Sequence, residues 1–237
     1  MCTVSFLPLA DRVLITSNRD EQPGRPSAIL PHSYSINNQE LLFPKDAKAC
    51  GTWIGVHENK GIAVLFNGAF RAHRPAYPYR KSRGLIFLDL VTGRHKRFQD
   101  NFNDISLDLI EPFSIIFYQD GMLWENRWDG QQKHSCEIDP LQAHLWGSAT
   151  IYSSETVNQR ITILRKWLSR HKSPAMEDLL QLHASDFILG EHPLLQTVSI
   201  TSIELKQDAA EMAYLDLAAD DFSRSRLSFR NSLAFQP

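Results

Sequence analysis

The sequence predicts an α+β fold in which strands and helices form separate layers. The chain has 237 residues, which is long enough to bury a large core. Short β-branched and apolar runs dominate its first and last parts, and two helical patterns follow one another in the second half. Because the strands come in groups rather than alternating singly with helices, we expect one layered domain over residues 1–237.

The N-terminal third is expected to contain two hairpins. Residues 3–7 and 13–17 are short apolar and β-branched runs that predict the first, with the tetrapeptide NRDE following its second strand. Residues 53–56 and 62–66 flank the polar turn HENKG and predict the second. Between the hairpins lie a loop rich in proline and glycine, residues 22–31, and then more strand-like sequence.

Three helices are expected. Ser82 can cap a largely apolar helix that begins at Gly84. Ser173 and Pro174, followed by two acidic residues, predict the start of the last helix. The helix between these two has one apolar face, marked by spacings of four, three and four at Val157, Ile161, Leu164 and Leu168.

Strand patterning returns twice more along the chain. Residues 113–118 and 122–128 flank a Gln-Asp-Gly turn and predict a hairpin. Three further strands are expected over residues 197–205, 213–217 and 224–229.

Composition and charge exclude several classes of protein. With 43% hydrophobic and 22% charged residues, the chain is typical of a globular protein. Its formal net charge of -2 provides no global field that would attract nucleic acid or an anionic membrane. The N-terminus lacks the features of a secretory signal, and no apolar run is long enough to span a bilayer. We therefore expect a soluble cytoplasmic protein without a transmembrane segment, and the oligomeric state stays open.

The cysteines and histidines do not form a metal-binding pattern. Cys2, Cys50 and Cys136 are far apart, odd in number and without a CxxC pair, which argues against both a disulfide framework and a zinc site. The nine histidines are scattered, and none lies at ligand spacing from a cysteine or carboxylate. We expect no metal site and no required cofactor.

Cys2 has a position that suits catalysis. If Met1 is removed, the new α-amino group, with an ordinary pKa of about 7.7 to 8.0, lies a few bonds from a thiol whose ordinary pKa is about 8.5. One residue then supplies both nucleophile and general base. Arg19 would favour the thiolate, and Asp20 could hold or orient the amine. The alternatives are a packed or merely exposed cysteine at position 2 and a surface ion pair between Arg19 and Asp20.

Acyl transfer also needs hydrogen-bond donors where negative charge develops on the carbonyl oxygen. Asn67 follows the apolar run 62–66 and is a candidate donor, with Gly68 allowing close approach of the backbone. The alternative interpretation of Asn67 and Gly68 is a simple turn.

The stretch RAHRPAYPYRKSRG is a loop with interleaved arginines and tyrosines. Its arginines could meet carboxylates while its tyrosines cover an apolar face of a ligand. The alternatives are a solvated surface loop and, on thinner support, nucleic-acid binding, which we do not expect in a chain of this charge. The candidate ligand-binding residues are Arg71, Arg74, Tyr77, Tyr79 and Arg83, with Arg80 as a further cation.

Four segments in order resemble one family. The initial Met-Cys, SNRDE, CGTWIGVHENKGIAVLFN and KSRG are similar to the NRDE family, also called the transport and Golgi organization protein 2 family, closely over the first third and more loosely beyond. The resemblance implies a fold of the N-terminal nucleophile (Ntn) hydrolase type, an αββα sandwich of two antiparallel sheets between helical layers. It also implies kinship with bile-salt and penicillin acylases, which cleave non-peptide amides with an N-terminal cysteine. By that kinship Cys2 would be the nucleophile, Arg19 and Asp20 would assist it, and Asn67 would serve the oxyanion hole.

The chain departs from those acylases in one respect. They have a second asparagine in mid-chain, where LWGSATIYSSE offers only Ser148, whose hydroxyl is a shorter and less oriented donor than an amide.

Two functions follow from the resemblance. The first is a cysteine amidohydrolase acting on a small acyl amide. The second is a non-catalytic carrier, since eukaryotic members are linked to secretion and Golgi organisation, to mitochondrial and lipid metabolism, and to haem trafficking. Haem or a lipid-like acid would then be the ligand, with Cys2 or His73 among the candidate axial ligands for haem.

Overall fold

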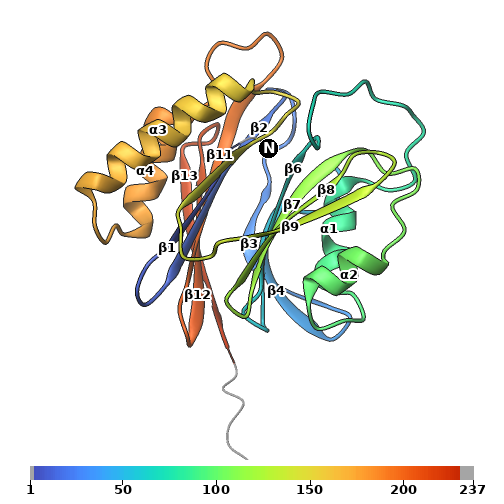
Figure 1. Cartoon of the computed structure of the whole chain (residues 1–237), viewed down its shortest axis with the longest axis horizontal. Helices are drawn as coiled ribbons and strands as arrows, with labels where there is room; N and C mark the ends of the chain where they lie inside the picture. The colour runs from blue at the N-terminus through green and yellow to red at the C-terminus, as the bar shows by residue number, and fades with distance from the viewer. Residues whose placement is uncertain (1–2, 230–237) are drawn as a thin grey trace, which may run out of the picture.

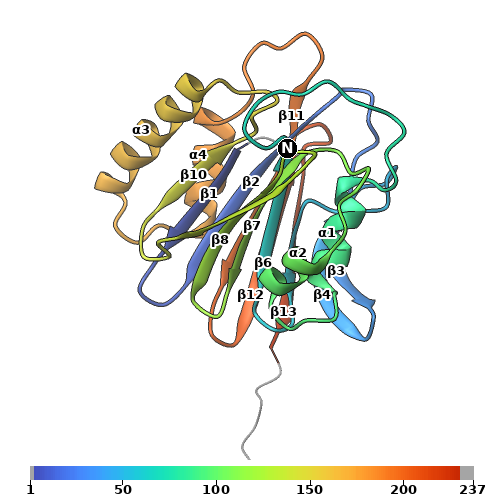
Figure 2. The same cartoon turned by 45° about the vertical axis from the view of Figure 1, so that its right-hand side comes forward.

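The computed structural model describes residues 3–229, in which two antiparallel sheets pack face to face and helices cover both outer faces (Figure 1). The expected αββα sandwich is confirmed. In both views β1 begins at the same end of the sandwich as the chain segments after β6 and after α4 (Figure 2). Cys2 lies outside the described residues.

The first sheet has six strands in the order β10-β1-β2-β11-β12-β13. The expected first hairpin is β1 and β2, in which Val4 lies opposite Ser17. The second strand is longer than expected, because β11 pairs with it as far as Glu21, so the NRDE tetrapeptide belongs to the strand rather than following it. The bounds are β1 Thr3–Pro8, β2 Val13–Glu21, β10 His144–Gly147, β11 Gln196–Leu205, β12 Ala209–Asp216 and β13 Asp221–Ser228.

The second sheet has seven strands that follow chain order from β3 to β9. The hairpins expected around residues 53–66 and 113–128 are confirmed as β5 with β6 and β7 with β8. The strand-like sequence before them forms a further hairpin, β3 with β4. The bounds are β3 Ile29–Ile36, β4 Gln39–Lys45, β5 Ile54–His57, β6 Ile62–Asn67, β7 Phe113–Gln119, β8 Met122–Trp128 and β9 Lys133–Ile138.

Helices α3 (Ser154–Arg170) and α4 (Met176–Asp186) cover the first sheet, and α1 (Arg83–Val91) covers the second (Figure 1). Ser82 caps α1 as expected, since its side chain accepts a hydrogen bond from the third residue of the helix. The last helix begins two residues later than its Ser-Pro signal predicts, with Ala175 as the N-cap.

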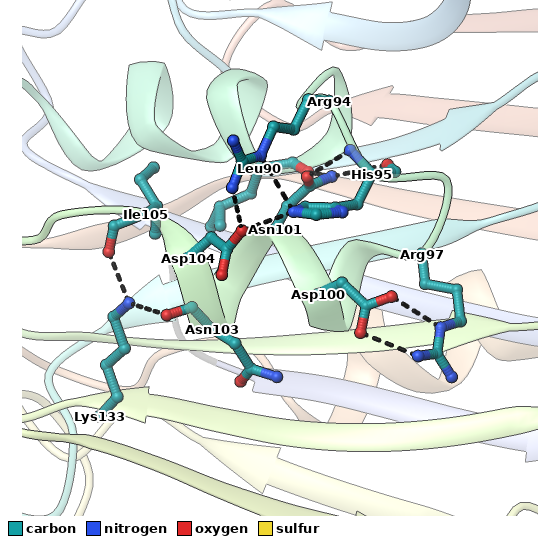
Figure 3. A network of polar contacts seen from close by, with 10 residues as sticks. All are labelled: Leu90, Arg94, His95, Arg97, Asp100, Asn101, Asn103, Asp104, Ile105 and Lys133. Atoms are coloured by element: carbon teal, nitrogen blue, oxygen red, sulfur yellow. Dashed lines mark hydrogen bonds and ion pairs between the residues drawn. The ribbon is translucent and has the colours of Figure 1, made fainter.

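A short helix, α2 (Phe98–Asp104), was not expected and depends on polar contacts (Figure 3). The Asn101 amide donates to the carbonyls of Leu90 (2.9 Å) and His95 (3.0 Å), which ties α2 to α1 and to the turn between them. Arg97 and Asp100 form a two-pronged ion pair in the first turn. These polar groups all bind one another, so the contacts explain why α2 forms and leave no role for a ligand there.

Side chains of the first sheet alternate between two environments, as strand geometry requires. Val13 and Ile15 of β2 belong to the large core between the sheets, whereas Leu14 packs in the cluster beneath α4. Odd-numbered residues of β2 therefore face the second sheet, and even-numbered ones face α3 and α4. Within residues 3–229, no helix has the length and apolar character needed to cross a membrane.

Candidate active site

Arg19 is buried at the end of β2 and faces the second sheet. Its guanidinium donates to a carboxylate oxygen of Asp46 (2.7 Å) and lies over the ring of Trp53, 4.7 Å from its centre. Arg25 binds both oxygens of the same carboxylate, at 2.9 and 3.0 Å. Two arginines thus share one carboxylate, which fixes the position of the Arg19 side chain.

Asp46 is suited to that task. Burial raises its pKa, but hydrogen bonds from Arg25 and from the Ala49 amide, together with the charges of Arg25 and Arg19, outweigh burial, so the pKa lies below its ordinary value. The carboxylate also accepts the Lys48 and Ala49 backbone N–H groups, which is a local turn typical of aspartate. It therefore stays ionised at neutral pH.

Asp20 faces the opposite side of β2. It accepts hydrogen bonds from the hydroxyl of Tyr152 (2.8 Å) and from that of Thr197. Pairing between β2 and β11 shifts by one residue between Thr197 and Ser199, the kind of bulge that re-aims a side chain. Arg19 and Asp20 are only 4% and 3% exposed, so the alternative of a surface ion pair is wrong.

Asn67, the last residue of β6, lies at a left-handed turn. Gly68 has a φ of +78°, and a Cβ there would lie 2.7 Å from a methyl carbon of Thr150, so both the backbone and the space favour glycine. The Ser148 hydroxyl donates to the backbone carbonyl of Asn67 (2.7 Å). Ser148 therefore lies beside Asn67, but its hydroxyl proton is used in the hydrogen bond to the Asn67 main chain.

A cavity of about 760 Å³ brings most of the expected residues together. It is lined by Arg19, Asn67, Tyr77, Tyr79 and Arg83, and also by the first turn of α1. The other two expected binding residues lie in neighbouring hollows. Arg71 borders a second cavity of about 770 Å³, and Arg74 borders one of about 250 Å³.

The walls of the first cavity carry more positive than negative side chains. Of its cations, Arg83 pairs with Glu111 (3.2 Å) and Lys81 with Asp89 (2.6 Å), whereas Arg80 donates to the backbone carbonyls of residues 106 and 108. The Arg80 charge thus meets carbonyl oxygens rather than a carboxylate. The lining comprises five cations (Arg19, Arg25, Arg80, Lys81 and Arg83) and three carboxylates (Glu21, Asp46 and Glu111).

A second polar system lies under the helices and was not expected from the sequence. His183 of α4 hydrogen-bonds the Ser5 hydroxyl (2.8 Å) through Nε2 and the Asn18 amide oxygen through Nδ1. Burial, and secondly the charge of Arg160, lowers the pKa of His183 to about 3, so the ring is neutral. All three residues are 0% exposed, which leaves no room for a substrate. The trio is therefore structural, although serine, histidine and asparagine could otherwise form a nucleophilic triad.

The spacing of α4 could have revealed His183. It lies four residues after Leu179, and both are 0% exposed on the buried face of the helix. Its partners in β1 and β2 are 165 and more residues away in sequence, so no local motif predicts them.

Cys50 and Cys136 are both exposed and free. Among residues 3–229, no group of three His, Cys, Asp or Glu side chains is arranged to hold a metal ion.

A family model described as Transport and Golgi organisation 2 matches residues 1–213 of the chain. No curated protein sequence matches the chain significantly.

Several solved structures share the fold. A cysteine-to-alanine mutant of the conjugated bile acid hydrolase from Clostridium perfringens has a TM-score of 0.57 at 9% identity, over 100% of this chain and 99% of the other. An N-acylethanolamine-hydrolyzing acid amidase orthologue from Caenorhabditis elegans has a TM-score of 0.60 at 12% identity, over 85% and 92%. An arginine-to-leucine variant of the same bile acid hydrolase gives 0.57 at 9%, over 98% of both chains. At these identities the likeness concerns the fold.

Proposed function

The chain belongs to the Transport and Golgi organisation 2 family and has the fold of the Ntn hydrolases, and from that premise we propose that it is a cysteine amidohydrolase. Its substrate would be a small acyl amide, and its nucleophile would be Cys2 after removal of Met1. The observation that supports this best is the burial of Arg19 beside a cavity at the end of β2, next to the start of β1.

The pairing of β1 with β2 supports this assignment. Val4 pairs with Ser17, and β2 then continues to the buried Arg19 and Asp20. Consecutive Cα atoms lie about 3.8 Å apart across a trans peptide bond, so a residue bonded to Thr3 would lie close to it. A reactive thiol at Cys2 would therefore work within reach of this pair.

The proposed reaction has two stages. The free α-amino group of Cys2 takes the thiol proton, and the thiolate adds to the amide carbonyl. When the tetrahedral intermediate collapses, the ammonium gives a proton to the leaving amine and a thioester remains on Cys2. The amine then takes a proton from water, whose oxygen attacks the thioester, and release of the acid regenerates the thiol.

Each neighbour has a distinct role in this proposal. Arg19 supplies positive charge that favours the thiolate. Asp20, held by Tyr152 and Thr197, would orient the ammonium. The Asn67 amide would donate to the oxyanion, while Ser148 fixes the Asn67 main chain through its carbonyl and contributes no donor of its own.

The cavity indicates the kind of substrate. Its volume of about 760 Å³ is within the usual range for small-molecule sites. The excess of cations, with Arg80 held only by carbonyls, favours a substrate that carries a carboxylate or another anionic group. Tyr77 and Tyr79, in edge contact with ring centres 5.2 Å apart, would cover an apolar part of it.

The test is to measure intact mass and thiol labelling of the untagged chain. We expect loss of Met1 and faster alkylation at Cys2 than at the exposed Cys50 and Cys136, which serve as internal controls. Incubation with acyl amides that carry a carboxylate should add an acyl mass that disappears in Cys2→Ala. Retained Met1, or equal reactivity of the three thiols, would contradict the proposal.

A carrier function is the second candidate, and the same cationic and aromatic cavity supports it. The ligand would then be a lipid-like acid or haem. His73 is less suited to haem than the sequence suggests, because its Nε2 hydrogen-bonds Glu111 (3.1 Å) and it borders a different cavity from Tyr77. Titration of haem into the wild-type protein without a change in the Soret band of free haem would remove this version.

A further inference from the structure

Large apolar side chains are exposed beside three neighbouring cavities: Tyr77 lines the first cavity, Phe70 the one that Arg71 borders, and Leu109 the one that Arg74 borders. Tyr77 is 78% exposed, Leu109 67% and Phe70 58%. Tyr77 and Phe70 lie on the segment that follows β6, and Leu109 on the one before β7. Three exposed arginines accompany them, and together we call this set the rim patch: Phe70, Arg71, Arg74, Tyr77, Arg80 and Leu109.

The segments that carry the rim patch are tied together. The Arg80 backbone N–H donates to the Leu109 carbonyl (2.8 Å), and its side chain donates to the carbonyl of Ser106 (2.8 Å). The Tyr79 hydroxyl accepts the Ala76 N–H at 2.7 Å. The exposed rings are therefore presented by a hydrogen-bonded scaffold.

Phe70 is positioned in a similar way. The guanidinium of Arg127 lies over its ring, 4.9 Å from the centre, and the His134 ring meets it edge-on at the same distance. Both partners belong to strands of the second sheet, so the sheet holds the Phe70 ring in place.

The rim patch is positively charged although the whole chain carries -2. No carboxylate among residues 3–229 forms an ion pair with Arg71, Arg74 or Arg80. The nearby carboxylates are already engaged: Glu111 pairs with Arg83 and His73, and Asp129 with His134. Asp108 accepts the Ser106 hydroxyl and is the exposed acid nearest in sequence to Leu109.

We propose that the rim patch docks on the surface of an anionic phospholipid bilayer. Tyrosine suits the headgroup layer, because its ring is apolar and its hydroxyl is polar, and phenylalanine and leucine can insert at the boundary with the acyl chains. The unpaired arginines meet the lipid phosphates and the anionic surface potential. A net negative chain can adsorb in this way, because screening limits the surface field to about a Debye length and only the nearest charges feel it.

Docking would place the mouth of the first cavity against the lipid. Tyr77 and Arg80 belong to the rim patch and also line that cavity. A lipid-like amide or acid could then enter from the membrane without crossing water. That delivery step rests on the proposed function, whereas adsorption to the bilayer does not involve Cys2.

The experiment is co-sedimentation of the untagged full chain with vesicles of phosphatidylcholine, alone or with about 30 mol% phosphatidylserine. We expect binding to the anionic vesicles, weaker binding to the neutral ones, and release at high salt. The double variant Arg71→Gln with Arg74→Gln should bind roughly 30-fold more weakly, since each basic residue near an anionic surface contributes about fivefold. The double variant Phe70→Ser with Tyr77→Ser should also lose binding while retaining its far-UV spectrum.

Two controls make the outcome specific. Arg165 and Arg170 are exposed on α3, so replacing both by glutamine changes the charge equally and should leave binding intact. Cys2→Ala should bind like the wild type, so a failure of catalysis is separable from a failure of docking. Absence of vesicle binding, an equal loss in both arginine pairs, or retention after the aromatic substitutions would overturn the proposal. In the first case the arginines would serve an acidic partner protein instead.

Discussion

Replacing His183 by glutamine is predicted to remove a specific part of the acid sensitivity of the fold. The ring is 0% exposed and its pKa is lowered to about 3, first by burial and secondly by the charge of Arg160. In the unfolded chain the pKa returns to its ordinary value of about 6.5. Between these two pKa values, His183 is therefore protonated in the unfolded state and neutral in the folded state.

The sign and size follow from this difference. Stability from His183 is complete above about pH 6.5 and is lost as the pH falls from there toward about 3, because each unit between the two pKa values costs about 1.4 kcal/mol. Between about pH 7.5 and about pH 5 the loss amounts to about 2 kcal/mol. The maximum, near pH 3, is about 5 kcal/mol.

Urea unfolding at the two pH values measures the effect. Other titrating groups are common to both proteins, so the wild type should lose about 2 kcal/mol more than His183→Gln between about pH 7.5 and about pH 5. The variant is expected to be less stable at the higher pH, because its side chain cannot reproduce both hydrogen bonds to Ser5 and Asn18. NMR of the wild-type ring gives an independent check, since its signals should not titrate between about pH 5 and about pH 8. Equal pH slopes, or a ring that titrates near pH 6.5, would refute the reasoning.

Two further pairs of substitutions, each a test with its control, probe the site and its support. Asp46→Asn leaves the buried Arg19 without its carboxylate and should lower the free energy of unfolding by about 3 to 5 kcal/mol. Its control, Glu177→Gln, breaks an exposed ion pair and should change that free energy by less than about 1 kcal/mol. Urea titration measures both. Gly51→Ala would place its Cβ 2.3 Å from a backbone carbon of α1's first turn and should lower the melting temperature, at a cost of about 1 to 3 kcal/mol. Gly24→Ala meets nothing within 4 Å and should be neutral or slightly stabilising; equal effects in either pair would contradict these assignments.

The fold was predictable where side-chain pattern and burial agree. The strands around residues 53–66 are buried nearly throughout and carry strong β-formers, so both were found. Helix α2 was missed because only Phe98, Asn101 and Phe102 of its seven residues are buried, and it depends on the Asn101 amide. Strand β9 was missed because it has no buried residue in KHSCEI, so no alternation marks it.

The site was predictable only in part, and for a similar reason. Arg19, Asp20 and Asn67 belong to short segments that carry a family likeness. Their partners do not: Tyr152 lies 132 residues from Asp20, and Thr197 lies 177 away. Contacts of that separation are set by the pairing of β2 with β11 and by the placement of the segment before α3, which no local pattern specifies.

Strand β2 separates two polar systems, because successive side chains point to opposite faces. Arg19 faces the cavity, whereas its neighbours Asn18 and Asp20 face the helical layer.

The polar system under the helices, which contains Ser5, Asn18 and His183, extends to the start of β1. The guanidinium of Arg160 donates to the Thr3 hydroxyl and lies 4.1 Å from the centre of the Tyr152 ring, and Tyr152 in turn donates to Asp20. Thr3 is the first residue of β1 and is 0% exposed. The helical layer therefore holds both the beginning of β1 and the carboxylate of Asp20 through the buried side chains of Arg160 and Tyr152. In an enzyme that uses Cys2, substitutions in α3 and α4 would alter the orientation of the nucleophile without changing the shape of the cavity, so reactivity and ligand affinity should vary independently.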